Sequence, residues 1–147
     1  MKVIGFGNIG SLVCQELSTV GGFESKTIAK KDFPKIVSVE EAEDKFPNIS
    51  LKKFDKQEIC FICSGEEKIS GALLRVLEKI KNSKINLVYI LRDPDLLSEA
   101  VSKQQDVFFK ILQNYARSGL FQSILCVDEL SVKKSFLAEV SILEYEK

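Results

Sequence analysis

Short apolar runs alternate with amphipathic stretches along most of this sequence, and no other feature constrains the fold as strongly. The runs predict strands at residues 2–6, 25–29, 59–63, 85–91 and 123–127. The stretches between them predict helices at residues 11–19, 39–46, 64–82 and 93–119. This alternation predicts a three-layer α/β fold, with a mainly parallel, Rossmann-like sheet and helices on both faces. At 147 residues, we expect one nucleotide-binding-fold domain over residues 1–147.

The first predicted strand runs directly into a glycine turn with the spacing Gly5-x-Gly7-x-x-Gly10. In a dinucleotide-binding fold such glycines allow close backbone approach, and the helix that follows offers free N–H groups to a phosphate. The candidate cofactor-binding residues of this turn are Gly5, Gly7, Asn8, Gly10 and Ser11. The alternative is a tight turn in which small residues let the helix and the strand pack closely.

A second loop follows the strand at residues 59–63 and reads SGEEKISG. Its candidates for gripping phosphate oxygens are Ser64, Gly65, Ser70 and Gly71. Glu66 and Glu67 oppose this role, because a carboxylate ~5 Å from a phosphate charge costs roughly 3 kcal/mol at an effective dielectric of about 20. The alternative is that Ser64 and Glu67 form the capping box of a helix, whose first turn favours negative charge.

The two loops are expected to meet. Ligands of parallel α/β sheets bind outside the carboxyl ends of the strands, at the point where the strand order reverses. Residues 5–11 and 64–71 each follow a predicted strand, so we expect both loops to border one crevice.

The end of the second predicted strand reads KTIAKKD, where a nicotinamide-binding unit carries an acidic residue that holds the ribose. Asp32 is the acidic candidate there, but Lys30 and Lys31 lie closer to the strand end. The two lysines would suit a 2′-phosphate or would form a solvated charge run.

Composition narrows the chemistry further. Lys and Arg number 21, and Asp and Glu number 21, so the net charge is zero. A zero balance argues against nucleic acid or a membrane surface as a partner held by bulk charge. The chain has no histidine, which removes the commonest general base and the commonest zinc ligand. We therefore expect no catalytic residue and no metal site.

The four cysteines indicate reduced thiols. Cys60 and Cys63 have the spacing of a zinc or redox pair, but residues three apart in a strand face opposite sides of the sheet. Cys14 and Cys126 also lie in apolar runs. We expect four buried, unreactive thiols, as in a reducing cytoplasm. No stretch approaches the length of a membrane span.

Three stretches carry a resemblance to a known family: KVIGFGNIGSLVCQEL, CFICSGEEKISGALLRVLEKI, and INLVYILRDPDLLSE with VFFKILQNYARSGLFQSILCVDE after it. They are similar, in order, to the first glycine loop and helix, the phosphate loop, and the later strand–helix–strand unit of the tubulin/FtsZ superfamily. The chain most resembles the amino-terminal half of divergent bacteriophage tubulin-like proteins. The resemblance implies GTP or GDP as the ligand.

The sequence also departs from that family. The family's phosphate loop is nearly all Gly and Thr, whereas the matching positions here include Glu66, Glu67 and Lys68. The family hydrolyses GTP with a catalytic loop that lies beyond the region of likeness. The resemblance therefore implies a degenerate, non-catalytic structural or assembly protein with weak or no GTP binding. It would contact copies of itself or another protein subunit, in the cytoplasm or, if bacteriophage-encoded, in the host cytoplasm or virion.

A second resemblance supports a different class of function. The stretches MKVIGFGNIGSLVCQEL and SGEEKISG are also similar to small nicotinamide-binding regulatory domains of ion transporters. That resemblance implies a domain that senses NAD(P) or a guanine nucleotide.

The carboxyl-terminal stretch FLAEVSILEYEK carries an alternating apolar face formed by Val140 and Ile142. An uncovered β-edge tends to pair with another chain. We expect this segment to pack partly on another subunit; the alternative is a last strand that closes the edge of its own sheet.

Overall fold

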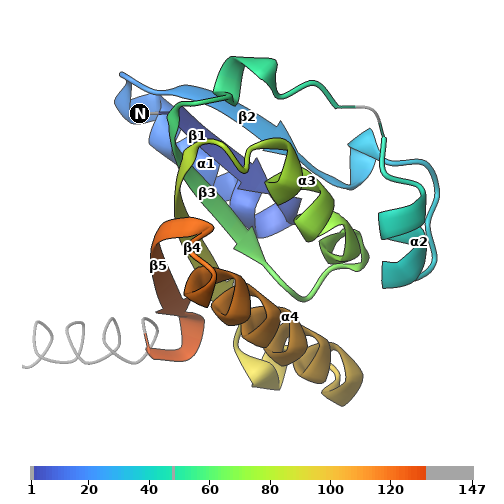
Figure 1. The fold of residues 1–147 in the computed structure, drawn as a ribbon. Coiled ribbons are helices and arrows are strands. Elements are labelled where there is room, and N and C mark those ends of the chain that lie inside the picture. The colour runs from blue at the N-terminus through green and yellow to red at the C-terminus, as the bar shows by residue number, and fades with distance from the viewer. Residues whose placement is uncertain (1, 48, 132–147) are drawn as a thin grey trace, which may run out of the picture.

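The computed structural model describes residues 2–47 and 49–131. One sheet of five parallel strands lies at its centre, in the order β2-β1-β3-β4-β5 (Figure 1). The strands are β1 (Lys2–Phe6), β2 (Glu24–Ile28), β3 (Glu58–Ser64), β4 (Lys84–Leu91) and β5 (Phe121–Asp128). The strand order reverses between β1 and β3, because β2 pairs with one edge of β1 and β3 pairs with its other edge. The reversal marks the crevice where doubly wound sheets bind ligands.

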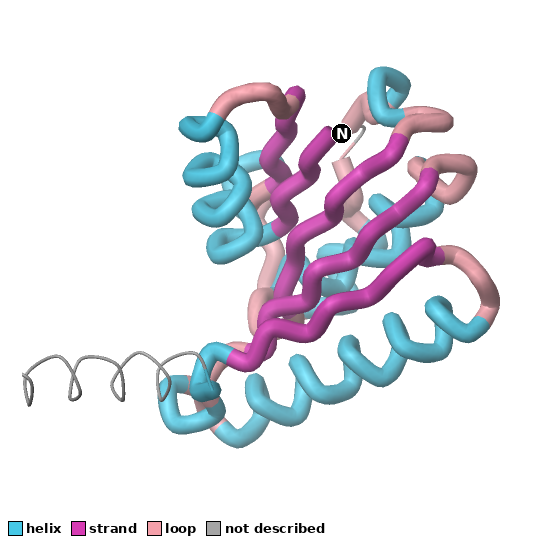
Figure 2. Tube along the Cα trace, turned by 90° about the vertical axis from the view of Figure 1, so that its left-hand side faces the viewer, coloured by secondary structure: helices cyan, strands magenta, loops and turns pink. Residues whose placement is uncertain are grey.

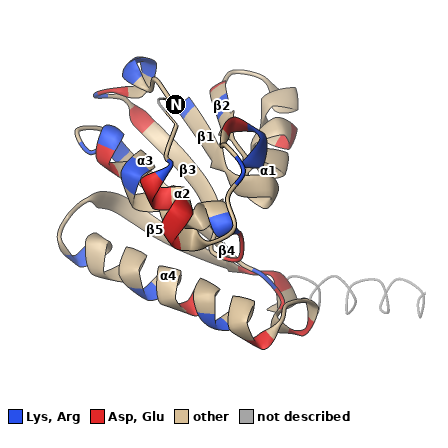
Figure 3. Cartoon of the chain, turned by 90° about the vertical axis from the view of Figure 1, so that its right-hand side faces the viewer, with Lys and Arg blue, Asp and Glu red and all other residues tan. Residues whose placement is uncertain are grey.

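Helices cover both faces of this sheet. They are α1 (Gly7–Val20), α2 (Val39–Asp44), α3 (Leu73–Lys79) and α4 (Glu99–Arg117). Of the described helices, only α1 packs on one face, while α2, α3 and α4 lie on the other, which faces the viewer in Figure 3. Lys, Arg, Asp and Glu are interspersed on that outer surface (Figure 3). The predicted three-layer, Rossmann-like α/β fold is confirmed.

Alternation along the strands builds two cores. Val3 of β1 and Ile62 of β3 pack against Cys14 of α1. The larger core lies on the opposite face, where Phe6 and Phe61 stack with ring centroids 6.3 Å apart. Strands β1 and β3 read as nearly continuous apolar runs because they are buried on both sides, as parallel strands are.

Three helix starts differ from the sequence-based prediction. α1 begins at Gly7 instead of residue 11, so the predicted turn at residues 7–10 is the first turn of the helix. The predicted capping box of Ser64 and Glu67 is wrong: Ser64 ends β3, a 3₁₀ turn spans Lys68–Ala72, and α3 starts only at Leu73.

The long helix α4 also starts later than predicted. The Asp93-Pro94 pair opens a separate 3₁₀ turn, Pro94–Leu96. The Ser98 hydroxyl caps α4 by accepting a hydrogen bond from the Val101 N–H at 3.2 Å. In the same region the predicted apolar residue Tyr115 is 39% exposed.

The cysteines lie partly as predicted. Cys60 faces the α1 side of β3 and Cys63 faces the opposite core, which confirms the prediction that they lie on opposite sides of the sheet. Cys14 and Cys63 are buried, but Cys60 is only half-buried and Cys126 is exposed. The prediction of burial was wrong for Cys60 and Cys126. Cys126 lies on the edge strand β5. Cys60 lies on β3 beside β4, whose α1 side no described helix covers.

Within residues 2–47 and 49–131, no helix is both long and apolar enough to cross a bilayer. The predicted interface segment around Val140 and Ile142 lies outside the described residues.

Candidate functional site

The two predicted loops meet at the carboxyl ends of β1 and β3. The backbone N–H of Asn8 donates a hydrogen bond to Oε2 of Glu67 at 2.7 Å. Asn8 is the second residue of α1, and Glu67 belongs to the loop after β3. The crevice at the strand-order reversal is therefore bridged by the chain's own carboxylate.

Gly7 shows how closely this carboxylate approaches the start of α1. A Cβ atom on Gly7 would lie 2.0 Å from Oε2 of Glu67. Gly7 also has a φ of +82°, which L side chains rarely adopt. In a dinucleotide-binding turn a phosphate oxygen accepts the free N–H groups at this helix start. Here Glu67 supplies the negative charge that a phosphate would bring.

The other two glycines of the fingerprint serve packing. A Cβ on Gly10 would lie 2.5 Å from the carbonyl oxygen of Ile62 in β3. A Cβ on Gly5 would lie 2.4 Å from the carbonyl oxygen of Gly10. Both contacts are backbone contacts that cannot rotate away, so α1 can lie this close to β1 and β3 only with glycine at these positions. Ser11, on the same helix, is 8% exposed, and its Oγ has no hydrogen-bond partner among the described residues.

The glycines of the second loop also pack against helices. A Cβ on Gly65 would lie 2.9 Å from the backbone of Gln105 in α4. A Cβ on Gly71 would lie 1.9 Å from the carbonyl oxygen of Val39 in α2. The structure thus brings the two loops together, and at both glycines of the second loop a side chain would clash with a helix.

The hydroxyls of the second loop are turned into the protein. Ser70 is fully buried and donates a hydrogen bond to the carbonyl oxygen of Ser64 at 3.1 Å. The Ser64 side chain is also buried, and its Oγ finds no partner within the described part of the chain. Neither hydroxyl contacts the Glu67 carboxylate at the start of α1.

Helix α4 holds the second loop in place through a glutamine that sequence reasoning missed. Nε2 of Gln104 donates hydrogen bonds to the carbonyl oxygens of Gly65 and Glu67, each at 2.9 Å. The next residue, Gln105, is buried, and its amide exchanges hydrogen bonds with the backbone of Arg92. The signal in the sequence was the pair of adjacent glutamines, Gln104 and Gln105, within a predicted amphipathic helix.

The environment of Glu67 disfavours its charged form. Burial raises the pKa of this carboxyl, and the nearby Glu66 adds to the rise, while the Asn8 N–H and Arg92 lower it. The raised pKa means that burial outweighs the stabilisation that the helix start provides. An anionic ligand at the same place would meet both this carboxylate and Glu66.

A second charged cluster ties together the loops after β3, β4 and β5. Nε of Arg92 lies 2.6 Å from Oε2 of Glu129, and a terminal nitrogen of Arg92 lies 3.3 Å from Oε1 of Glu66. The hydrogen bond that Arg92 donates to Glu129 is the main cause of the raised pKa of Arg92. Oε2 of Glu129 also accepts from the Asp93 N–H at 3.0 Å. Arg92 was missed in the sequence, although an arginine directly after an apolar strand was the available signal.

A small cavity of about 210 Å³ lies beside the bridged crevice. It is lined by Lys30, Ile36, Glu67, Lys68 and Ile69. Asp32, the predicted ribose-binding candidate, instead accepts a hydrogen bond from the Ala29 N–H at 2.9 Å and so closes its own turn. The cavity is smaller than the ~300–1,000 Å³ that ligand pockets usually enclose.

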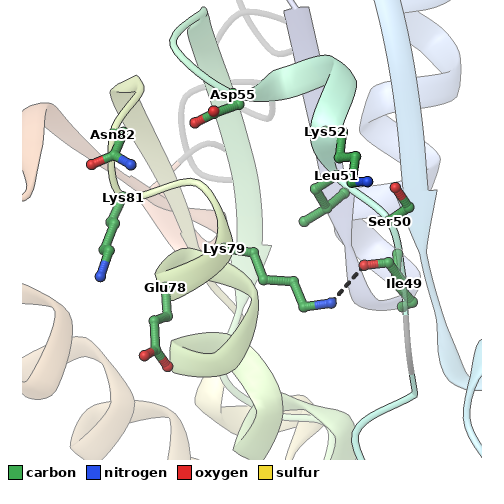
Figure 4. A pocket seen from close by; sticks show the side chains of 9 residues that line it. All are labelled: Ile49, Ser50, Leu51, Lys52, Asp55, Glu78, Lys79, Lys81 and Asn82. Atoms are coloured by element: carbon green, nitrogen blue, oxygen red, sulfur yellow. Dashed lines mark hydrogen bonds between the residues drawn. The ribbon is translucent and has the colours of Figure 1, made fainter.

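A larger groove, of about 820 Å³, lies at the opposite edge of the sheet (Figure 4). It is bordered by Asp55, which precedes β3, and by Asn82, which precedes β4, so it sits at the amino ends of the strands. Lys79 reaches across it and donates a hydrogen bond to the carbonyl oxygen of Ile49 at 2.7 Å. Doubly wound sheets bind ligands at the other edge. The groove is therefore not the candidate site.

The described residues contain no group of three or more Cys, Asp, Glu or His side chains that could hold a metal ion. Burial raises the pKa of the Cys63 thiol, so this sulfur stays protonated and unreactive.

Comparison with protein-family models, with curated proteins and with solved structures found no match for this chain.

Proposed function

We propose that this chain is a non-catalytic α/β domain that acts as a structural or assembly protein, through contacts with copies of itself or with another protein subunit. In this proposal it binds GTP, GDP and nicotinamide nucleotides weakly or not at all. The observation that carries the proposal is the hydrogen bond between Glu67 and the Asn8 N–H at 2.7 Å, where a nucleotide phosphate would bind. The tubulin-like character suggested by the sequence motifs belongs to the same proposal.

The magnitude of the electrostatic conflict supports weak binding. A phosphate placed ~5 Å from the Glu67 carboxylate would lose roughly 3 kcal/mol at an effective dielectric of about 20. That loss corresponds to about two decades of affinity. The phosphate would also have to break the existing hydrogen bond to Asn8. The second loop offers little compensation, because its glycines pack against helices and both its hydroxyls are buried.

Thermal unfolding with GTP, GDP, NADH and NADPH tests this proposal directly. A ligand at 100 times its dissociation constant adds ~2.7 kcal/mol of stability, which shifts the melting temperature measurably. We expect no shift for the unmodified chain at millimolar nucleotide. Phosphate release from GTP, followed over a range of protein concentrations, should stay at the background rate. Turnover that rises with protein concentration would show a self-assembled catalytic site and end the proposal.

A nucleotide-sensing role is the second candidate, and the cavity beside Glu67 favours it. Lys30 and Lys68 flank that cavity at the carboxyl end of β2, where a dinucleotide's ribose lies in related folds. Two cations there would suit a 2′-phosphate, so this candidate predicts NADPH rather than NADH as the ligand. A melting-temperature shift with NADPH that disappears in Lys30→Ala would favour sensing over assembly.

A further inference from the structure

Strand β5 is the outermost strand on one side of the sheet, as Figure 2 shows. One edge of β5 pairs with β4, and its other edge pairs with no strand among residues 2–47 and 49–131. Such an edge presents a row of backbone N–H and C=O groups with which a further strand can pair. Two apolar side chains of β5 are also accessible, since Ile124 is 37% exposed and Leu125 is 59% exposed.

The sequence of β5 does little to protect this edge. Natural sheets usually blunt an edge strand with charged residues, with proline or with a bulge. From Phe121 to Val127, β5 carries no charged residue and no proline. The register irregularity between Ile85 and Asn86 of β4 affects the start of the strand, while residues 123–128 pair regularly with β4. Most of β5 therefore offers a regular and uncharged edge.

The other edge of the sheet differs in this respect. It is formed by β2, which has five residues and carries Glu24 and Lys26. Oε2 of Glu24 lies 3.1 Å from the ammonium nitrogen of Lys2, so a partner strand would have to accommodate an ion pair. Of the described strands, β2 and β5 lie at the edges. The uncharged edge strand that a second copy of this chain offers is therefore its own β5.

Charge also selects the relative orientation of two such strands. A parallel pairing would place Asp128 of one copy beside Asp128 of the other, and like charges directly opposite each other are destabilising. An antiparallel pairing keeps these two carboxylates at opposite ends. If the pairing is centred on Leu125, residues 123–127 of both copies face one another without any charge, and Asp128 lies opposite Gln122.

We propose that two copies of this chain pair through their β5 edges, antiparallel and about a two-fold axis at Leu125, so that their sheets join into one sheet with five strands from each copy. The same surface is used on both copies, so the pairing closes as a dimer and does not continue into a filament. This inference rests on the proposed function as an assembly protein, and it identifies the surface that contacts a copy of itself.

Sedimentation velocity of the full chain, from micromolar to hundreds of micromolar, tests this pairing. We expect a monomer–dimer equilibrium that shifts towards the dimer as the concentration rises. Leu125→Lys places two like charges opposite each other at the axis and should raise the dimer dissociation constant about tenfold or more. Leu12→Lys is the matched control and should leave dimerisation unchanged, because Leu12 lies on α1, is 50% exposed and is distant from β5 in the sheet order.

A mixing experiment distinguishes strand pairing from a general loss of structure. Leu125→Glu alone should weaken the dimer as Leu125→Lys does, whereas an equimolar mixture of the two variants should dimerise again, because opposite charges then meet at the axis. The urea midpoint of each variant reports whether it is folded.

Several outcomes would overturn the β5 pairing: a chain that stays monomeric at every concentration, a dimer that persists in Leu125→Lys, an equal loss in Leu12→Lys, or a mixture that does not dimerise. None of these outcomes decides whether the chain assembles with another protein subunit. Nucleotide binding or turnover, measured separately, would instead overturn the proposed function, so the two failures are distinguishable.

Discussion

The contact between Glu67 and the start of α1 can be measured by a double-mutant cycle with Gly7→Ala and Glu67→Ala. Removing the Glu67 carboxylate deletes a charged hydrogen bond at a helix N-terminus, which we expect to cost about 1–2 kcal/mol of stability. Gly7→Ala introduces a side chain at a φ of +82°, a strain of about 1–2 kcal/mol. Its Cβ would also lie 2.0 Å from Oε2 of Glu67 and expel that carboxylate, so the carboxylate contact of ~1–2 kcal/mol is lost as well.

The two single variants therefore lose the same contact, and their effects cannot add. The sum of the singles is about 3–6 kcal/mol, while the double variant should lose only about 2–4 kcal/mol. The coupling energy is then about 1–2 kcal/mol. Urea denaturation resolves it, since a change of ~2 kcal/mol moves the midpoint by about 1 M at a typical slope for a small domain.

Gly119→Ala is the matched control for this cycle. Gly119 has a φ of +88°, and a Cβ there would meet nothing within 4 Å. It therefore carries the backbone strain and the change in unfolded-chain entropy without the contact to Glu67. Gly119→Ala and Glu67→Ala should be additive within about 0.3–0.5 kcal/mol. If Gly7→Ala and Glu67→Ala are equally additive, the carboxylate does not occupy the start of α1, and the proposed reason for weak nucleotide binding is refuted.

Two further predictions follow from the same site. Gly10→Ala should lower the free energy of unfolding by about 1–3 kcal/mol through overpacking against β3. Urea denaturation of the double variant Gly10→Ala, Glu67→Ala should show the same loss relative to Glu67→Ala alone. The unmodified chain should gain stability relative to Glu67→Gln as the pH falls from 7. Burial raises the pKa of Glu67 in the folded protein above its ordinary 4.5, so the folded state takes up the proton at a higher pH than the unfolded state. The gain begins at the raised folded pKa and is complete below the unfolded one; a stability difference that is constant from pH 7 to pH 4 would contradict it.

Burial on both faces is what made the central strands recognisable in the sequence. Residues 59–63 form an unbroken apolar run because β3 lies between α1 and the larger core. The boundaries of β4 were predicted within one residue for the same reason. Strand–helix alternation then left few topologies open, since parallel connections are right-handed and need a crossover. The fold class was therefore accessible from local patterns alone.

The local capping pattern misled because the partner of Glu67 is distant in the sequence. Ser64 and Glu67 have the spacing of a capping box, which presumes that both side chains bond to nearby backbone groups. Glu67 instead bonds to Asn8, 59 residues away, and Ser64 remains part of β3. Ser38 and Glu41 have the same spacing at the start of α2, and there half of the motif forms: the Ser38 hydroxyl accepts from the Glu41 N–H, while the Glu41 carboxylate accepts from the Val37 N–H. The local sequence does not distinguish these two cases, because they differ in which distant residues contact the loop.

The glycine fingerprint combines two requirements that this chain separates. Gly5 and Gly10 satisfy the packing requirement, because backbone atoms of α1 and β3 occupy the space that their side chains would need. Gly7 satisfies the conformational requirement for a helix start with exposed N–H groups. Those N–H groups attract an anion. The Glu67 carboxylate is an anion already attached to the chain, so its binding there costs no translational freedom. An internal carboxylate therefore competes with an external phosphate at an advantage, and the same three glycines serve the fold whether or not a phosphate binds.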